Sequence, residues 1–245
     1  MTTLITRFAA IATAFAVLGC SDERPPAPAS PSPAVRSPTE AAVPSVIDEL
    51  ANKNNAPTID KNRRGIEFPP GYDWLEQERV IEAWKTLHQQ AAELLPDLVA
   101  HANEERYSVT FEINERWYNS SVGMQCWSVF RSTVECYELA PDLFRYCRLR
   151  FVPEPPELHA WWQARKDKSL IGLQLEMLDE YQAALAEAKK RNTETPTPEF
   201  YELVAAKLAA IQTQIRNSGK PVIRMAFLEM YSFRNYPIGA DDNEQ

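Results

Sequence analysis

Histidines and acids are the residues of this chain whose types could support catalysis or metal binding. The three histidines, His88, His101 and His159, lie on separate predicted elements without metal-ligand spacing. His101 and Glu104 are three residues apart near a predicted helix end, so they could share one site. The motifs HExxH, GxSxG, GxxxxGK[ST] and CxxC and the EF-hand loop do not occur. The sequence therefore predicts no metal, no cofactor and no catalytic residue.

Carboxylates are abundant, and a pair such as Glu112 and Glu115 keeps an enzymatic alternative open. A glycosidase needs two carboxylates about 5–10 Å apart on either side of the scissile bond, a separation that sequence does not define. Whether the protein is an enzyme is therefore uncertain, with a non-enzymatic protein favoured. The alternative is a cell-wall hydrolase with paired carboxylates and an aromatic platform for sugar.

Two aromatic pairs, Trp117-Tyr118 and Trp161-Trp162, are candidates for contact with a partner. Exposed aromatic rings beside polar groups suit sugar rings or peptides. Neighbouring residues of a helix point about 100° apart, so one of Trp161 and Trp162 should face the core. We take Trp117, Tyr118 and Trp162 as candidate partner-binding residues, and core packing is the favoured alternative for each pair.

Residues 1–20 have the parts of a secretory signal peptide. Arg7 precedes an apolar run over residues 8–18, and this run is shorter than the roughly 20 residues of a membrane-spanning helix. The end, Val17-Leu18-Gly19-Cys20, resembles a bacterial lipobox, although Val17 and Leu18 depart from its commonest form. The resemblance implies cleavage of residues 1–19 and attachment of lipid, such as palmitate, at Cys20. An ordinary cleaved signal is the alternative.

Residues 20–44 follow as a lipidated cysteine and a proline-rich tether. The segment has almost no large apolar side chains, so it cannot form a core. Extended as polyproline II it could span roughly 70 Å. Ser21, rather than Asp, follows the cysteine. By the same lipoprotein resemblance this implies delivery to the outer membrane, facing the periplasm.

Export makes the remaining cysteines informative, because the compartment is oxidising. Cys126 and Cys136 should share one helix and lie about 15 Å apart, beyond disulfide reach. We prefer a disulfide between Cys136 and Cys147 across the turn at Pro141. Cys126 would then be a buried apolar thiol.

The formal net charge of −8 argues against nucleic acid or an anionic lipid surface as the main partner. With only 7 glycines, the chain has no glycine-rich phosphate loop. A basic stretch with Arg145, Arg148 and Arg150, and with Arg131 nearby, could hold an anionic group. Pairing with the surplus acids is the favoured interpretation.

Periodicity predicts a mainly α fold of about five to six helices with a small two-stranded sheet. The globular domain should cover residues 72–239, between a transitional segment at 45–71 and a disordered tail at 240–245. Asp73 should cap the first helix, and Pro96 should interrupt it. Residues 106–113 alternate as a strand, with 148–152 as the natural partner. Further helices are predicted at 122–138, 157–166, 170–191 and 198–218. The run Asn119-Ser120-Ser121 should cap the first of them, Ser169 the third and Thr197 the last, with Gly219 at its end.

Residues 119–137 (NSSVGMQCWSVFRSTVECY) and 161–176 (WWQARKDKSLIGLQLE) together resemble segments of uncharacterised exported bacterial domains. The resemblance implies no activity and transfers no catalytic residue. We therefore expect a membrane-anchored envelope lipoprotein that acts as a binding or scaffold module. Its partners would be the membrane, through the lipid, and an envelope protein or peptidoglycan, but no nucleic acid. A carrier with a ligand cavity between helices is a third, weaker idea.

Overall fold

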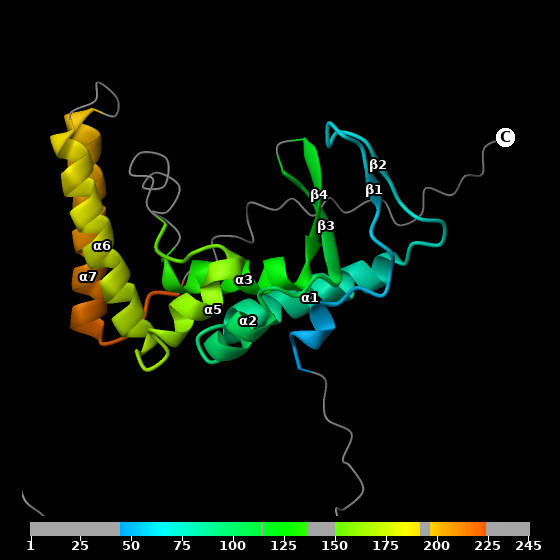
Figure 1. The fold of residues 1–245 in the computed structure, drawn as a ribbon, viewed down its shortest axis with the longest axis horizontal. Helices are drawn as coiled ribbons and strands as arrows, with labels where there is room; N and C mark the ends of the chain where they lie inside the picture. Colours follow the sequence, from blue (N-terminus) through cyan, green and yellow to red (C-terminus); the bar gives the residue numbers. More distant parts are fainter. Residues whose placement is uncertain (1–44, 114, 137–149, 192–196, 224–245) are drawn as a thin grey trace, which may run out of the picture. The chain divides into compact units, whose positions relative to one another are not determined.

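The computed structural model describes residues 45–113, 115–136, 150–191 and 197–223. These ranges form six α-helices, a short 3-10 helix and two two-stranded antiparallel sheets (Figure 1). The predicted mainly helical fold with a small sheet is confirmed. In chain order the elements are η1 Asp48–Leu50, β1 Thr58–Ile59, β2 Ile66–Glu67, α1 Trp74–Gln90, α2 Leu95–His101, β3 Tyr107–Ile113, β4 Arg116–Ser121, α3 Val122–Val134, α5 Pro155–Gln163, α6 Leu170–Lys190 and α7 Pro198–Ser218.

The helix ends follow local capping chemistry. The side chains of Asp73, Ser121 and Ser169 each accept a hydrogen bond from an amide in the first turn of α1, α3 and α6. Gly219 ends α7 in the left-handed conformation, with φ of 62°, which glycine adopts at little cost. Pro96 lies in the first turn of α2, which begins at Leu95 after a gap of four residues from the end of α1 at Gln90. These predicted caps and the restart at Pro96 are confirmed, whereas α3 ends at Val134 and not near residue 138 as predicted.

Helix α3 lies at the centre of the core. It packs against α1, α2, α5 and α6. Its inward residues have no exposed surface: Val122, Cys126, Val129, Phe130 and Val134. The ring of Trp162 from α5 meets Phe130 edge-on, with centroids 5.7 Å apart. Burial of this helix therefore supplies much of the hydrophobic stabilisation.

The partner of strand β3 corrects the sequence prediction. β3 pairs with β4, which follows it directly, so that Phe111 lies opposite Tyr118 and Ile113 opposite Arg116. Residues 150–152 form no strand, and Phe151 and Val152 are instead buried in the core. The antiparallel hairpin closes through a short turn. The distant pairing that we predicted would have required a much longer loop.

Residues 45–71 contribute to the folded body ahead of Tyr72. Ile47 and Leu50 are buried in the main hydrophobic cluster. Arg79 of α1 fixes this segment by donating to the carbonyl oxygens of Glu49 and Ala51 at 2.8 and 3.0 Å. The segment that looked transitional in sequence therefore packs on α1.

Helices α6 and α7 pack along each other (Figure 1). Their buried faces carry Tyr181 and Leu185 on α6 and Val204 and Leu208 on α7. The buried amide of Gln174 on α6 donates to the carbonyl oxygen of Thr133 at 2.9 Å, which ties α6 to the end of α3. No helix in the described ranges is long and apolar enough to cross a membrane.

Candidate functional site

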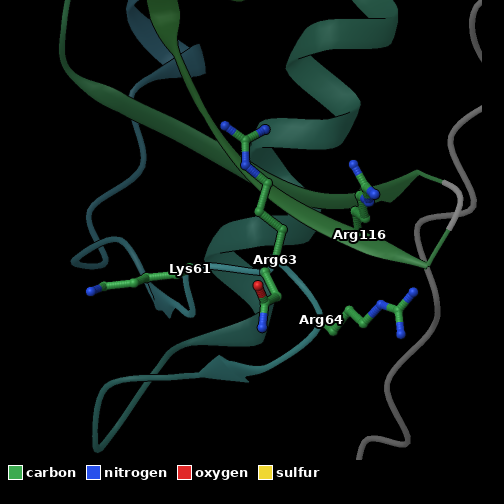
Figure 2. A pocket seen from close by; sticks show the side chains of 5 residues that line it. Lys61, Arg63, Arg64 and Arg116 are labelled. Atoms are coloured by element: carbon green, nitrogen blue, oxygen red, sulfur yellow. The ribbon is translucent and has the colours of Figure 1, made fainter.

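A basic pocket lies where two hairpin turns meet. It has a volume of about 390 Å³ and is lined by Lys61, Asn62, Arg63, Arg64 and Arg116. The first four residues belong to the turn between β1 and β2, and Arg116 begins β4 (Figure 2). All five are exposed. The four cationic residues, Lys61, Arg63, Arg64 and Arg116, are called the basic pocket below.

The turn between β1 and β2 is held by Asp60. Its carboxylate accepts hydrogen bonds from the amides of Arg64 and Gly65 at 3.0 and 2.9 Å. The backbone of Asp60 also pairs with Gly65 and Arg63. Arg63 has φ of 59°, a left-handed conformation that is costly for a residue with a side chain. The surrounding hydrogen bonds therefore hold three consecutive pocket positions, 62–64, in a defined turn.

The two hairpins are tied together near the pocket and further back. The amide of Trp117 donates to the carbonyl oxygen of Arg63 at 2.7 Å. Beyond it, the side-chain amide of Asn119 donates to the carbonyl oxygen of Pro57 at 2.7 Å. Asn119 is itself fixed, because its side-chain oxygen accepts from Thr110 at 2.7 Å. Backbone and side-chain bonds therefore bring Arg116 beside the loop of Arg63 and Arg64.

One of the four cations also has an aromatic support. The guanidinium of Arg63 lies over the ring of Tyr118, 4.6 Å from its centroid. Tyr118 in turn stacks on Phe111 across the hairpin at 5.8 Å. Figure 2 shows Arg63 and Arg116 extending in the same direction, whereas Lys61 and Arg64 reach to either side. The backbone positions of these residues are fixed by the hydrogen bonds described above. The side chains of Lys61 and Arg64 can rotate toward a ligand.

The basic pocket has no acidic partner within the described part of the chain. None of the ion pairs there includes Lys61, Arg63, Arg64 or Arg116. This is notable in a protein with a net charge of −8. Other arginines in the chain do pair with carboxylates: Arg79, Arg106, Arg131, Arg150 and Arg165. The pocket therefore concentrates positive charge that no carboxylate of the described residues pairs with.

The candidate partner-binding aromatics lie mainly in the core. Trp117 and Trp162 are 8% and 7% exposed, so neither offers a ring face to a partner in this conformation. Trp161, the neighbour of Trp162, is the half-buried member of its pair. Tyr118 is half-buried and lies under Arg63, beside the basic pocket. Among the three candidates, therefore, only Tyr118 contacts the site with its side chain, whereas Trp117 reaches it through its backbone amide.

His101 and Glu104 do form a pair, but the interactions around this pair stabilise the fold and do not suggest catalysis. Nδ1 of His101 lies 3.0 Å from a carboxylate oxygen of Glu104. The same carboxylate pairs with Arg106, whose hydrogen bond holds the pKa of Glu104 below its usual value.

Cys126 is buried, and burial, together with the charge of Glu104, raises the pKa of its thiol to about 12. A thiol held protonated in this way is not a nucleophile at neutral pH.

The remaining predicted site residues lie partly outside the described ranges. Cys20 and Cys147 fall in segments that the structure does not describe, so lipid attachment and the Cys136–Cys147 disulfide stay predictions. Cys136 is buried, and its Sγ lies 3.9 Å from the carbonyl oxygen of Val222. Among the described residues, no group of three or more His, Cys, Asp and Glu side chains could hold a metal ion.

Sequence reasoning did not single out the residues of the basic pocket. Arg131 and Arg150 pair with Glu135 and Glu154, as the favoured interpretation of that stretch held, while Arg145 and Arg148 lie outside the described residues. The signal for the basic pocket was the run Lys61-Asn62-Arg63-Arg64 in an acidic chain. Its meaning depends on Arg116, which only the pairing of the two hairpins brings near.

Comparisons with protein-family models, curated proteins and solved structures found no match to this chain. The functional argument therefore depends on the chemistry of the site itself.

Proposed function

We propose that this chain is a membrane-tethered, non-enzymatic binding protein of the cell envelope whose basic pocket takes an anionic partner. The single observation that carries the proposal is the pocket itself: four cations at two joined turns, with no ion pair to a described carboxylate. The lipobox-like end at Cys20 and the proline-rich tether over residues 20–44 supply the proposed location and reach.

The arrangement favours binding over a merely solvated charged face. Two turns distant in sequence are fixed to each other through Trp117 and Asn119, so the cost of assembling the cations is met during folding. Arginine presents a planar fork that matches carboxylate and phosphate groups. Both groups occur in cell envelopes, as carboxylates of peptidoglycan stems and as phosphates of lipids and glycans.

The test is co-sedimentation of the full-length protein with purified cell wall and with envelope membranes, with Cys20→Ala in every protein so that the proposed lipid does not itself insert into the membranes. The pocket variant, R63Q/R64Q/R116Q, removes three positive charges from the site. The control variant, K207Q/R216Q/K220Q, removes three exposed charges on and just after α7, so the net charge of the two variants is equal. We expect the wild type and the control variant to sediment, and the pocket variant to stay in the supernatant.

Salt gives a second readout of the same proposal. Retention through exposed cations should fall as ionic strength rises, because the Debye length shrinks to about 8 Å at 0.15 M. Equal retention of the pocket and control variants, both with native circular dichroism, would remove the pocket from the function. Failure of all three proteins to sediment with either material would contradict the proposal as a whole.

A further inference from the structure

We propose that the ligand of the basic pocket is a phosphate or diphosphate group carrying at least two negative charges. This inference deepens the proposed function and rests on it. It specifies the chemistry of the bound group, which is shared by phosphorylated small molecules and by phosphate-bearing headgroups. The basis is the number and type of the cations and their rigid attachment at the joined turns.

Charge density favours phosphate over a single carboxylate. The pocket, of about 390 Å³, is lined by three arginines and one lysine. Their side chains extend in different directions in Figure 2, so a bound ligand would have to draw them together. A carboxylate carries one negative charge, whereas a phosphate monoester carries about −1.5 to −2 near neutral pH and offers three acceptor oxygens. A carboxylate would leave most of the four cations uncompensated. A phosphate or diphosphate can engage several of them together.

The nearest acids along the chain, Asp60 and Glu115, form no ion pair with the pocket cations among the described residues. The Asp60 carboxylate is engaged by the amides of Arg64 and Gly65. Glu115 occupies the turn before β4 with φ of 59° and takes part in no ion pair of the described chain. Binding of an external anion therefore does not require an existing ion pair to break. This distinguishes the pocket from Arg79 or Arg131, which are committed to Glu76 and Glu135.

Tyr118 is proposed as the positioning residue of this site. Its ring supports the guanidinium of Arg63 at 4.6 Å and leaves the N–H groups at the edge of the guanidinium able to point outward. Trp117, its neighbour on β4, holds the backbone of Arg63 through the 2.7 Å hydrogen bond. Arg63 is thereby oriented by both backbone and side chain before a ligand arrives.

The first experiment measures binding of inorganic pyrophosphate to the full-length protein by calorimetry, with citrate as the non-phosphate polyanion. We expect pyrophosphate to bind at least 10-fold more tightly than citrate. The pocket variant should lose at least 10-fold in affinity, since it removes three guanidinium groups that would donate charge-assisted hydrogen bonds to the anion. The control variant should bind like the wild type. Equal affinity for citrate and pyrophosphate would overturn the phosphate assignment.

Two substitutions at Tyr118 test the positioning role. Tyr118→Phe keeps the ring under Arg63 and should bind pyrophosphate within 2-fold of the wild type, whereas Tyr118→Leu removes the ring and should weaken binding by about 2- to 5-fold. Thermal unfolding of both variants separates this effect from misfolding. Equal binding by two folded variants would overturn the role of Tyr118.

Vesicles distinguish the source of the phosphate. Flotation of the protein carrying Cys20→Ala, which lacks the proposed lipid, with phosphatidic acid in phosphatidylcholine and with phosphatidylcholine alone tests whether a headgroup reaches the pocket. Dependence on phosphatidic acid that the pocket variant abolishes indicates a lipid ligand; no dependence, with pyrophosphate still bound, indicates a soluble one. If pocket-dependent retention on cell wall persists but pyrophosphate neither binds nor competes, the phosphate assignment fails and the proposed function stands.

Discussion

His88 is a buried imidazole whose Nε2 has no hydrogen-bond partner among the described residues. Its side chain is 4% exposed and belongs to the buried face of α1. The ring lies edge-on to Trp84, with the two ring centroids 4.5 Å apart. Burial lowers the pKa of His88 to about 4, because the charged form would lose its hydration. The residue therefore acts as an apolar ring at neutral pH. When the solution is acidified, protonation of His88 would destabilise the folded state.

This position predicts a loss of stability between pH 6.5 and 4. In that window the unfolded chain binds a proton at His88 and the folded chain does not, so acidification favours unfolding. The free energy of unfolding should fall by about 3 kcal/mol across the window, at 1.36 kcal/mol per pKa unit. Urea titrations at pH 7, 5.5 and 4.5 measure it. His88→Phe should flatten the dependence, whereas substitution of the exposed His159 by Gln should leave it unchanged.

The pair of Glu76 and Arg79 makes a second residue-scale prediction. Two hydrogen bonds from Arg79, at 2.7 and 2.9 Å, hold the pKa of Glu76 at about 2. This stability is fully present above the usual carboxylate pKa and is lost as pH falls from about 4.5 through 2. Arg79→Ala should cost about 3 kcal/mol at pH 7, because it leaves a nearly buried carboxylate without its main partner.

Lys85 supplies the control for Arg79 on the same helix. It pairs with Glu82, and both side chains are exposed. Lys85→Ala should cost less than about 1 kcal/mol, as exposed ion pairs generally do. Equal costs for Arg79→Ala and Lys85→Ala in urea denaturation would contradict the importance that we give to burial.

At the scale of elements, Gly123 allows the start of α3 to meet the link between α2 and β3. A Cβ atom at this position would lie 2.5 Å from the amide nitrogen of Glu104 and 2.7 Å from the carbonyl oxygen of Ala102. Both atoms belong to backbone and cannot rotate away. Gly123→Ala should therefore destabilise the protein by about 2–3 kcal/mol in spite of the higher helix propensity of alanine.

Gly172 in the first turn of α6 is the matched control. A Cβ atom there would meet only side-chain atoms, Ser169 Oγ at 3.5 Å and Lys168 Cβ at 3.7 Å. Gly172→Ala should leave stability unchanged or raise it by up to about 1 kcal/mol. Thermal unfolding of the two variants under one condition gives the comparison. A stabilising Gly123→Ala would show that the two segments do not approach so closely.

The helices and strands also differ in how far they could be predicted from neighbouring residues alone. Asp73, Ser121, Ser169 and Gly219 could be predicted because a cap depends on the residues of one helix end. The polar residues Asn119 and Ser120 belong to β4, although in sequence they read as part of a helix cap. Their partners, the Pro57 carbonyl and the Gln125 side chain, lie on other parts of the chain. A strand stabilised by such contacts lacks the apolar alternation that identifies strands in sequence.

The basic pocket could not be predicted from the sequence because it, too, depends on contacts between separate parts of the chain. The run at residues 61–64 is short, and Arg116 is more than fifty residues away along the chain. What joins them is the hydrogen bond between Trp117 and Arg63. Charge spacing predicts pairs within one helix, but it does not predict which two turns a fold will fasten together.

At the scale of the whole molecule, net charge and local charge have different consequences. The chain as a whole carries −8, which should repel extended anionic surfaces, whereas the basic pocket attracts a compact anion at short range. This combination favours one projecting anionic group over a broad polyanion.

The proposed anchor gives the last prediction. If Cys20 carries lipid, Cys20→Ala should remove the acyl chains on which stable anchoring depends. The protein should then move from the membrane fraction to the soluble fraction and lose its labelling by radioactive palmitate. Ser21→Asp should keep the lipid but shift the protein from outer to inner membrane, as the lipoprotein resemblance implies. Density-gradient fractionation measures both. A membrane-bound, palmitate-labelled Cys20→Ala protein would refute the anchor, whereas an outer-membrane Ser21→Asp protein would refute only the sorting rule.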